Sequence, residues 1–450
     1  MKILSHHNSN RRFLTVGALV LASLSGSLGL GLQSAGAQSA GASTPTGVLS
    51  PYATLTNPTD TFWALTIDPA GNLYTVDTTN CQVIKIDATT QVSSVISTNI
   101  NWCDQVYNMT YAVVAGTPTL IIADYGNAAI YTVPATGGDV TQVGYEDAPS
   151  GVAYDSSSDT LYIADWYNLG SPLWKITSFS TCTNAIPCTA TEIYSTGVDY
   201  ALGLLLQGST LYSLSYATSG LLASIPTSGG AWTLSFDTIN SSYDYGTPAA
   251  DPAGNIYYLD VDSSKVYELP AGGSTSTAMT ISGGSLSSPS GGPVYFNGAL
   301  YVVDYSQEGT SSIVKITLPA AVPTNVTATP GNGSATVSWT ASPGATSYTV
   351  TSSPGGQTCT ATAPSTSCVV SGLTNGTSYT FSVVATNSAG ASGPSTASAP
   401  VTPAAPAVTV AAATLAKTGS PLGSTLLVGL CALSLGTMMI LGRRRRHQVS

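Results

Sequence analysis

Ten aspartates carry most of the chemistry that this sequence offers. The chain has 22 acidic residues, and ten of them recur at equivalent places in a repeated pattern. Carboxylates in such a set can accept hydroxyl protons, bind Ca²⁺ or work in pairs as acid and base. Five stand at the end of a short apolar segment: Asp77, Asp124, Asp165, Asp260 and Asp304. Five more stand a few residues ahead of another apolar segment: Asp60, Asp104, Asp147, Asp199 and Asp244.

Aromatic residues accompany these acids, notably Tyr125, Trp166 and Tyr305, each directly after a strand-end aspartate. Two interpretations are open. In the structural one, each aspartate accepts backbone N–H bonds in its own tight turn, and the aromatics pack between sheets. In the functional one, the aromatic faces stack on sugar rings while the carboxylates bind hydroxyl groups or Ca²⁺. The set is therefore a candidate ligand-binding rim for a glycan or for calcium.

The absence of two residue types between the ends excludes several kinds of site. The three histidines are His6, His7 and His447, and no arginine lies between Arg12 and Arg443. The central part therefore lacks the residues for a Ser-His-Asp triad, a histidine metal site or an arginine clamp. A glycosidase needs only two carboxylates and stays open, although nothing marks one pair above the others.

The charge balance also limits the partners. Without the two ends, five lysines remain against 22 acidic residues, a net charge of −17. Such a surface repels nucleic acid, so we expect no nucleic-acid partner. No cofactor is predicted, with Ca²⁺ as the one candidate ion.

Six copies of one pattern position these residues. Each copy is a short apolar strand, and the last residues of the copies are 47, 41, 50, 45 and 44 positions apart. A second apolar strand ends nine to twelve residues later. A period in the forties with about four short strands per unit is typical of a β-propeller blade. The last residues of the six copies are Asp77, Asp124, Asp165, Ser215, Asp260 and Asp304.

This pattern predicts a six-bladed β-propeller over residues 46–318. The sixth unit lacks room for an outer strand, and Gly47–Leu55 can supply it. In such blades the second-strand ends and the loops entering the first strands open on one face, which gathers the ten aspartates. The strand ends resemble NHL-type repeats, although the Asn-x-Arg-Ile sequence usual in that family is absent.

Residues 322–403 resemble a fibronectin type III domain. The resemblance rests on Trp339 in a Thr-Val-Ser-Trp strand, on Tyr348, and on Tyr379 at the end of Gly372–Tyr379. It implies that Trp339 fills the core of a β-sandwich and that the hydroxyl of Tyr379 bonds back to the backbone. Residues 404–414 then form an extended Ala/Pro stalk.

The two ends indicate export and anchoring. Residues 1–37 have basic residues, an apolar run and a small-residue cleavage site, as in a signal peptide. Residues 415–450 resemble the sorting signal of Gram-positive surface proteins, in the variant of the Leu-Pro-x-Thr-Gly motif with alanine in place of proline. The pentapeptide is Leu415, Ala416, Lys417, Thr418 and Gly419, followed by an apolar segment at 424–441 and an Arg-rich tail.

This resemblance implies that a sortase cleaves between Thr418 and Gly419 and attaches the chain to cell-wall peptidoglycan. Segment 424–441 is long enough for a transmembrane helix, and the arginines after it hold that end in the cytoplasm. A simple one-span membrane protein is the alternative. Either way, we expect the chain to be displayed on the cell surface.

Six cysteines remain outside the apolar segments, an even number that fits an oxidising compartment. Proximity in the sequence favours three local pairs, although six cysteines allow 15 connectivities. The predicted pairs are Cys81 with Cys103, Cys182 with Cys188, and Cys359 with Cys368.

The predicted fold class is all-β: a six-bladed β-propeller followed by a fibronectin type III β-sandwich, with a C-terminal transmembrane helix. The predicted function is that of a cell-wall-anchored surface protein that binds an extracellular glycan, cation-bridged ligand or protein. The alternatives are a carboxylate-based extracellular polysaccharide hydrolase and a structural surface spacer. Enzymatic activity is not the favoured interpretation.

Overall fold

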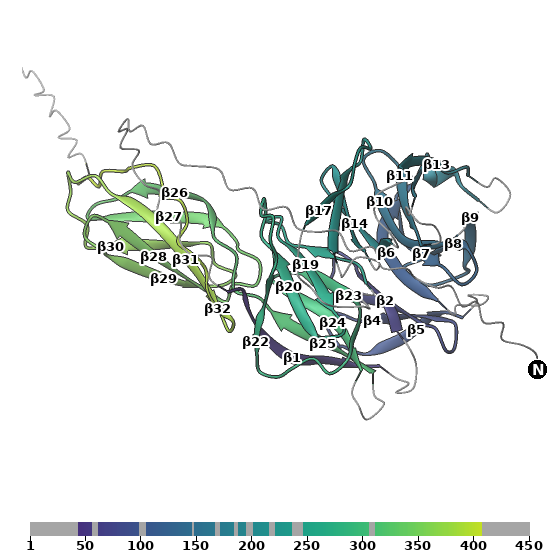
Figure 1. Cartoon of the computed structure of the whole chain (residues 1–450). Helices are drawn as coiled ribbons and strands as arrows, with labels where there is room; N and C mark the ends of the chain where they lie inside the picture. Colours follow the sequence, from purple (N-terminus) through teal and green to yellow (C-terminus); the bar gives the residue numbers. More distant parts are fainter. Residues whose placement is uncertain are drawn as a thin grey trace, which may run out of the picture.

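The structure, a computed structural model, describes residues 44–55, 62–98, 105–145, 148–166, 172–183, 188–194, 201–215, 221–235, 246–305 and 311–406. These residues are almost entirely β-strand and turn, and their one helical element is the short 3-10 helix η1 (Phe179–Thr181). Figure 1 shows two bodies, a larger one of six sheets and an elongated sandwich.

Residues 46–318 form six sheets, five of them antiparallel and the sixth mixed, which we call the six-sheet domain. Within each of the first five sheets, the four strands follow one another in chain order. The first sheet contains β2 (Phe62–Ile67), β3 (Leu73–Asp77), β4 (Gln82–Ile86) and β5 (Ser93–Ser97). The second contains β6 (Val106–Val114), β7 (Thr117–Asp124), β8 (Ala129–Pro134) and β9 (Thr141–Tyr145). The third contains β10 (Pro149–Asp155), β11 (Thr160–Asp165), β12 (Leu173–Thr177) and β13 (Thr191–Tyr194).

The remaining sheets follow the same plan, with one addition. The fourth contains β14 (Ala201–Gln207), β15 (Thr210–Ser215), β16 (Leu221–Pro226) and β17 (Thr233–Ser235). The fifth contains β18 (Ala249–Ala250), β19 (Ile256–Asp260), β20 (Lys265–Leu269) and β21 (Thr277–Ala278). The sixth has five strands in the order β22 (Thr280–Ser282), β1 (Thr46–Thr54), β25 (Ser311–Thr317), β24 (Ala299–Tyr305) and β23 (Pro289–Phe296).

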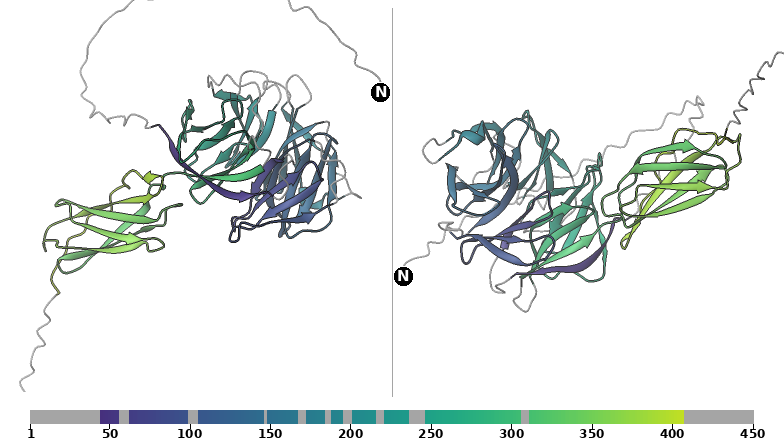
Figure 2. Two further views of the ribbon diagram at one scale, coloured as in Figure 1. Left: turned by 90° about the horizontal axis from the view of Figure 1, so that it is seen from below. Right: turned by 180° about the vertical axis from the view of Figure 1, so that it is seen from behind.

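Strand β1 is the predicted N-terminal strand that joins the last sheet. It pairs antiparallel with β25, from Val48 opposite Thr317 to Thr54 opposite Ser312, and parallel with β22. Figure 2 shows it as a purple strand beside the green strands of that sheet. Because β1 covers the edge of β25, the two ends of the six-sheet domain are tied together.

The first strands of the sheets are innermost and pack against one another. Strand β2 contacts both β6 and β23, and β10 contacts both β6 and β14. The second strands are buried on both faces, as their near-continuous apolar sequences require. In β3 and β19 all five residues are buried.

The predicted fold class was wrong in its propeller: among the described residues the strands are divided among separate small sheets, and a closed propeller is not found. No helix in this part of the chain has the length and apolar character needed to cross a membrane. The predicted span 424–441 lies outside the described residues. What holds of the prediction is its all-β character and the sandwich that follows.

The sandwich has two sheets. One contains β26 (Thr324–Pro330), β27 (Ser334–Thr340) and β30 (Ser367–Ser371). The other contains β29 (Thr358–Thr362), β28 (Ser347–Ser353), β31 (Thr380–Asn387) and β32 (Gly390–Ala391). Trp339 is buried against Tyr348, with ring centroids 5.1 Å apart, and the Tyr379 hydroxyl accepts a bond from the Thr374 N–H at 3.0 Å. Both predicted roles are confirmed.

Disulfides form between Cys182 and Cys188 and between Cys359 and Cys368, as predicted. Cys81 is also disulfide-bonded, whereas Cys103 lies outside the described residues. The signal peptide (1–37), the sorting pentapeptide (Leu415–Gly419), the apolar segment 424–441 and nearly all of the 404–414 stalk lie outside them too.

Candidate functional site

The strand-end aspartates share one end of the six-sheet domain, which we call the acidic end. Register places Asp77 opposite Phe62, Asp124 opposite Val106 and Asp304 opposite Pro289, at the point where each first strand begins. The other end, where each first strand turns into the second, is the hairpin end. Each of these aspartates therefore lies at the end of its sheet where the first strand begins, and the ligand-binding rim itself stays a prediction.

These carboxylates are nevertheless buried. Asp124 is 0% exposed, Asp165 1%, Asp77 2%, Asp260 4% and Asp304 7%. Their burial has a local cause, because they accept hydrogen bonds from nearby turns. The remaining five predicted rim acids, Asp60, Asp104, Asp147, Asp199 and Asp244, lie outside the described residues.

Asp77 shows how such a turn is built. Its Oδ1 accepts the N–H groups of Thr79 and Asn80 at 2.9 and 3.0 Å, and its Oδ2 accepts the Asn80 side-chain amide at 2.9 Å. Asp124 repeats this arrangement with Asn127, at 3.2 Å from the backbone and 2.8 Å from the side chain. The sequence interpretation missed these asparagines, although their constant spacing of three residues after the aspartate was a visible signal.

Two further aspartates vary the theme. Asp260 accepts the backbone N–H of Ser263 at 3.0 Å and its hydroxyl at 2.5 Å. Asp304 instead accepts the N–H groups of Ser287 and Ser288, at 3.0 and 2.8 Å, from the loop that leads into its own sheet. Each carboxylate thus fixes the loops at the acidic end.

Three aromatic rings meet at this end, and we call them the aromatic triad: Tyr107, Tyr125 and Trp166. The ring centroids of Tyr107 and Trp166 are 5.7 Å apart with planes 16° from parallel. Tyr125 lies 5.6 Å from Tyr107 and 5.9 Å from Trp166. All three side chains are half-buried. The predicted Tyr125 and Trp166 are therefore brought together, and Tyr107 of β6 completes a group that spans the second and third sheets.

A recurrent backbone bond holds these rings in place. The residue after the strand-end aspartate donates its N–H to a carbonyl ahead of the first strand, as Tyr125 does to Gln105 and Trp166 to Ala148, both at 3.0 Å. Tyr305 makes the same bond to Ser288 at 3.0 Å, in the sixth sheet. In β8, burial raises the pKa of Tyr131, and the nearby Asp124 carboxylate raises it further.

No group of three or more His, Cys, Asp or Glu side chains suited to a metal ion occurs within the part of the chain that the structure describes. The five strand-end aspartates belong to five different sheets, and Asp77, Asp124, Asp260 and Asp304 each bind a nearby turn or loop. The calcium hypothesis therefore has no cluster to rest on among these residues.

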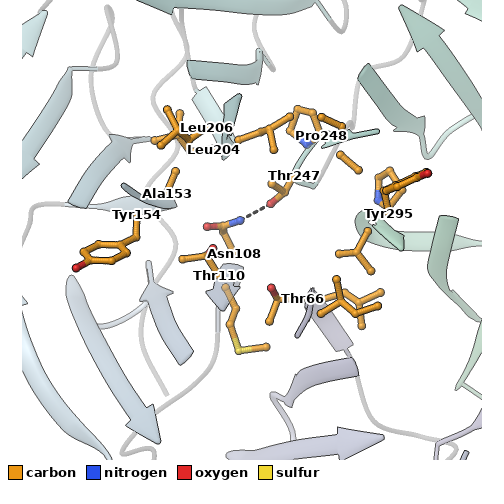
Figure 3. A pocket seen from close by; sticks show the side chains of 18 residues that line it. Thr66, Asn108, Thr110, Ala153, Tyr154, Leu204, Leu206, Thr247, Pro248 and Tyr295 are labelled. Atoms are coloured by element: carbon orange, nitrogen blue, oxygen red, sulfur yellow. Dashed lines mark hydrogen bonds between the residues drawn. The ribbon is translucent and has the colours of Figure 1, made fainter. Parts of the chain in front are cut away.

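A cavity lies along the first strands on the hairpin side, away from the aspartates (Figure 3). Its volume is about 230 Å³, and residues of all six first strands or their flanks line it. The lining residues used below are Thr66, Asn108, Thr110, Ala153, Thr247 and Tyr295. Asn108 donates from Nδ2 to the Thr247 hydroxyl and accepts the Val152 N–H at 2.6 Å. The lining contains no acidic side chain.

Comparison with known proteins identifies the family of the sandwich domain, whereas for the six-sheet domain it shows only a general structural similarity. Residues 321–401 match the fibronectin type III domain family, and they form that domain here. No curated protein sequence matches the chain. The disulfides and this extracellular-type domain indicate an exported, surface-type protein.

Several solved structures resemble the six-sheet domain, and they are propeller-like proteins. A nidogen/laminin complex has 14% identity and a TM-score of 0.42, covering 50% of this chain and 81% of that chain. A streptogramin B lyase has 11% identity and a TM-score of 0.42, covering 60% and 98%. A luciferin-regenerating enzyme has 11% identity and a TM-score of 0.46, covering 60% and 95%. Such low identities and TM-scores carry no activity over to this chain.

Proposed function

We propose that this protein is a cell-wall-anchored surface protein whose six-sheet domain binds an extracellular glycan at the aromatic triad. The single observation that carries the proposal is the contact of three half-buried rings at the acidic end. Aromatic faces bury apolar surface against sugar rings.

Burial of the acids favours binding over hydrolysis. A general acid or nucleophile must reach the glycosidic bond, and the described strand-end carboxylates are at most 7% exposed. This burial does not hinder a site that binds through its aromatic rings.

The placement of the fibronectin type III domain supports the same function. Strand β25 runs from the acidic end to the hairpin end, so the chain enters the sandwich at the hairpin end. The acidic end therefore faces away from the sandwich and from any attachment through Leu415–Gly419. A sortase and cell-wall peptidoglycan are the partners that this orientation suits, with the glycan as external ligand.

The test is a glycan array with the secreted two-domain chain, followed by titration of the best ligand. We expect Trp166→Ala to weaken binding about tenfold, or ~1.4 kcal/mol, because it removes one stacking face. Tyr107→Phe is the matched control, since it keeps the ring and should retain affinity. An array without any retained glycan contradicts the proposal and leaves a structural spacer, whereas release of shortened glycan supports the hydrolase.

A further inference from the structure

Inner segments approach one another closely on the acidic side of the cavity. A Cβ on Gly203 would lie 2.6 Å from the Thr247 Cα, and one on Gly246 would lie 2.4 Å from the Gly292 nitrogen. The backbones of neighbouring inner segments are thus in direct contact on the acidic side of the cavity. The bond between Asn108 and Thr247 joins the second sheet to the fifth across the same level. Among the described residues, these contacts restrict the passage to the cavity from the acidic end.

β-Bulges create this space. Five of the six first strands shift register at an equivalent level, for example between Leu202 and Leu205 in β14 and between Ser290 and Val294 in β23. A bulge re-aims the side chains that follow it, and such irregularities are over-represented beside functional sites. The cavity begins on the hairpin side of these bulges.

Its lining combines apolar side chains with polar groups, among them several hydroxyl groups. Leucine, isoleucine, valine, proline, alanine and methionine side chains make up most of the lining. Thr66, Thr110 and Thr247 come from three different sheets, and Figure 3 shows them around Asn108. Tyr154 and Tyr295 contribute their rings, whereas their hydroxyl groups point outward in this view. No Lys, Arg, Asp, Glu or His side chain lines the cavity.

The hydrogen bonds that the lining hydroxyl groups already make determine which polar groups a ligand would need. The Thr66 hydroxyl accepts the Tyr111 N–H at 3.0 Å, and the Thr247 hydroxyl accepts from Asn108. A hydroxyl that already accepts a bond keeps its own proton for donation. The cavity therefore presents donors, and its ligand should carry an acceptor such as a carbonyl or ether oxygen.

We propose that this cavity is a second binding site, distinct from the aromatic triad, for a small uncharged molecule with an apolar ring and a carbonyl or ether oxygen. Size sets the upper limit. An apolar cavity of about 150 Å³ binds benzene, so about 230 Å³ suits a ring compound slightly larger than that. A charged ligand would lose its hydration without a counter-charge in the lining.

The experiment uses the secreted two-domain chain. Binding of three probe molecules is measured by ligand-observed NMR titration. The probes are cyclohexanone, cyclohexanecarboxylate and cyclohexylamine, which share one ring and differ in charge. We expect saturable binding of cyclohexanone and at least tenfold weaker binding of the two ions. Absence of cyclohexanone binding, or equal binding of all three probes, overturns the proposal.

Two variants locate the bound molecule. Ala153→Leu should reduce cyclohexanone affinity at least fivefold by filling the cavity. Thr110→Val should reduce it about threefold, because it removes a donor without changing the side chain's shape. Thr336→Val, the same change on the exposed face of β27, is the control and should leave affinity unchanged. Equal affinity in the wild type and both cavity variants would place the probe elsewhere and refute the site.

Discussion

At the scale of single residues, the hairpin turns show how repeated sequence becomes repeated structure. Asp68 accepts the N–H groups of Ala70 and Asn72 at 2.9 Å, the Asn72 side chain at 2.7 Å and the Tyr74 hydroxyl at 3.0 Å. Asp251 makes the same four bonds with Ala253, Asn255 and Tyr257, within 0.1 Å of those lengths. One Asp-Pro-Ala-Gly-Asn sequence thus builds one turn twice.

One difference between these two turns has an electrostatic consequence. In the first sheet Lys85 stands opposite Tyr74, with its ammonium 5.9 Å from the ring centroid, and Lys315 stands likewise over Tyr301. In the fifth sheet Glu268 takes this place opposite Tyr257. Burial raises the pKa of Glu268, and the Asp251 carboxylate raises it further. The turn in the fifth sheet therefore has two carboxyl groups, Asp251 and Glu268, close together. The equivalent turn in the first sheet has one negative and one positive group, Asp68 and Lys85.

We predict that Glu268→Lys stabilises the protein at neutral pH by roughly 0.5 kcal/mol, the scale of a partly exposed ion pair. The pKa of Glu268 is higher in the folded chain than in the unfolded chain. The protonated Glu268 therefore contributes its full stabilisation at pH values below its pKa in the unfolded chain, and this contribution is lost as the pH rises through its pKa in the folded chain. The added stability of Glu268→Lys over the wild type should therefore appear at pH values above the pKa of Glu268 in the folded chain and vanish in acid. Urea denaturation at several pH values measures it.

Glu192→Lys is the control for a simple change in net charge, since Glu192 is exposed on β13. A gain of the same size and pH dependence in this variant would contradict the local explanation. An unchanged or reduced stability of Glu268→Lys at neutral pH would contradict it as well.

At the scale of elements, the inner strands depend on glycine for their close approach. Gly203 has φ +61°, and a Cβ there would lie 2.6 Å from the Thr247 Cα. Gly208, in the turn after the same strand, has a similar φ of +59° but no atom within 4 Å of such a Cβ. The two positions separate the cost of backbone conformation from the cost of a collision.

We predict that Gly208→Ala costs about 1–2 kcal/mol, the penalty of the left-handed region for alanine. Gly203→Ala should cost at least about 2 kcal/mol more, because the strands must also move apart. Thermal and urea unfolding of the two variants measures both values. Equal losses would show that the inner strands can separate freely.

The sequence predicted the elements better than their contacts. The period and the strand-end aspartates were visible because short-range turn chemistry fixes them, as with Asp77 and Asn80. The joining of β1 to β25 followed from the missing strand in the last unit. The fibronectin type III residues Trp339 and Tyr379 were equally local signals.

The aromatic triad and the cavity depend on how neighbouring sheets pack against each other, and no local sequence pattern predicts this packing. Tyr107 stands beside Trp166 only because β6 and β10 pack side by side. The cavity depends on bulges whose positions, such as that between Val106 and Asn108, leave no clear mark in the strand sequence. The acids were therefore predicted, whereas their burial and the space at the other end were not.

At the scale of the whole molecule, the two domains are joined by direct hydrogen bonds as well as by the chain. The buried Asn387 of the sandwich donates to the carbonyl oxygens of Leu318 at 2.8 Å and Gly344 at 3.1 Å. The Gly344 N–H reaches Asn297 Oδ1 at 3.3 Å. A Cβ on Gly298 would lie 2.7 Å from the Gly344 Cα, so the two turns touch. In Figure 1 this junction lies where β32 approaches the six-sheet domain.

We predict that Asn387→Ala loosens this junction, because it removes both bonds that Nδ2 donates and leaves the Leu318 carbonyl without that donor. It also removes the two bonds that Oδ1 accepts from the Ala389 and Gly390 N–H groups in the adjoining turn. Small-angle scattering of the two-domain chain should show a broader distribution of distances, with the fold of each domain retained. Asn375→Ala is the matched control: Asn375 bonds Gly333 and Asn332 inside the sandwich and precedes the start of β31, whereas Asn387 ends that strand. It should lower the stability of the sandwich without changing the distribution.

An unchanged distance distribution in Asn387→Ala would mean that the touching turns alone fix the domains. Gly298→Val then separates the possibilities, since its side chain would press against the Gly344 backbone and force the turns apart. If the distribution broadens only in this second variant, steric contact sets the orientation. A fixed orientation matters for the proposed function because it points the aromatic triad away from the attachment side. A loosened junction should leave glycan affinity unchanged, but it should change the direction in which the acidic end faces.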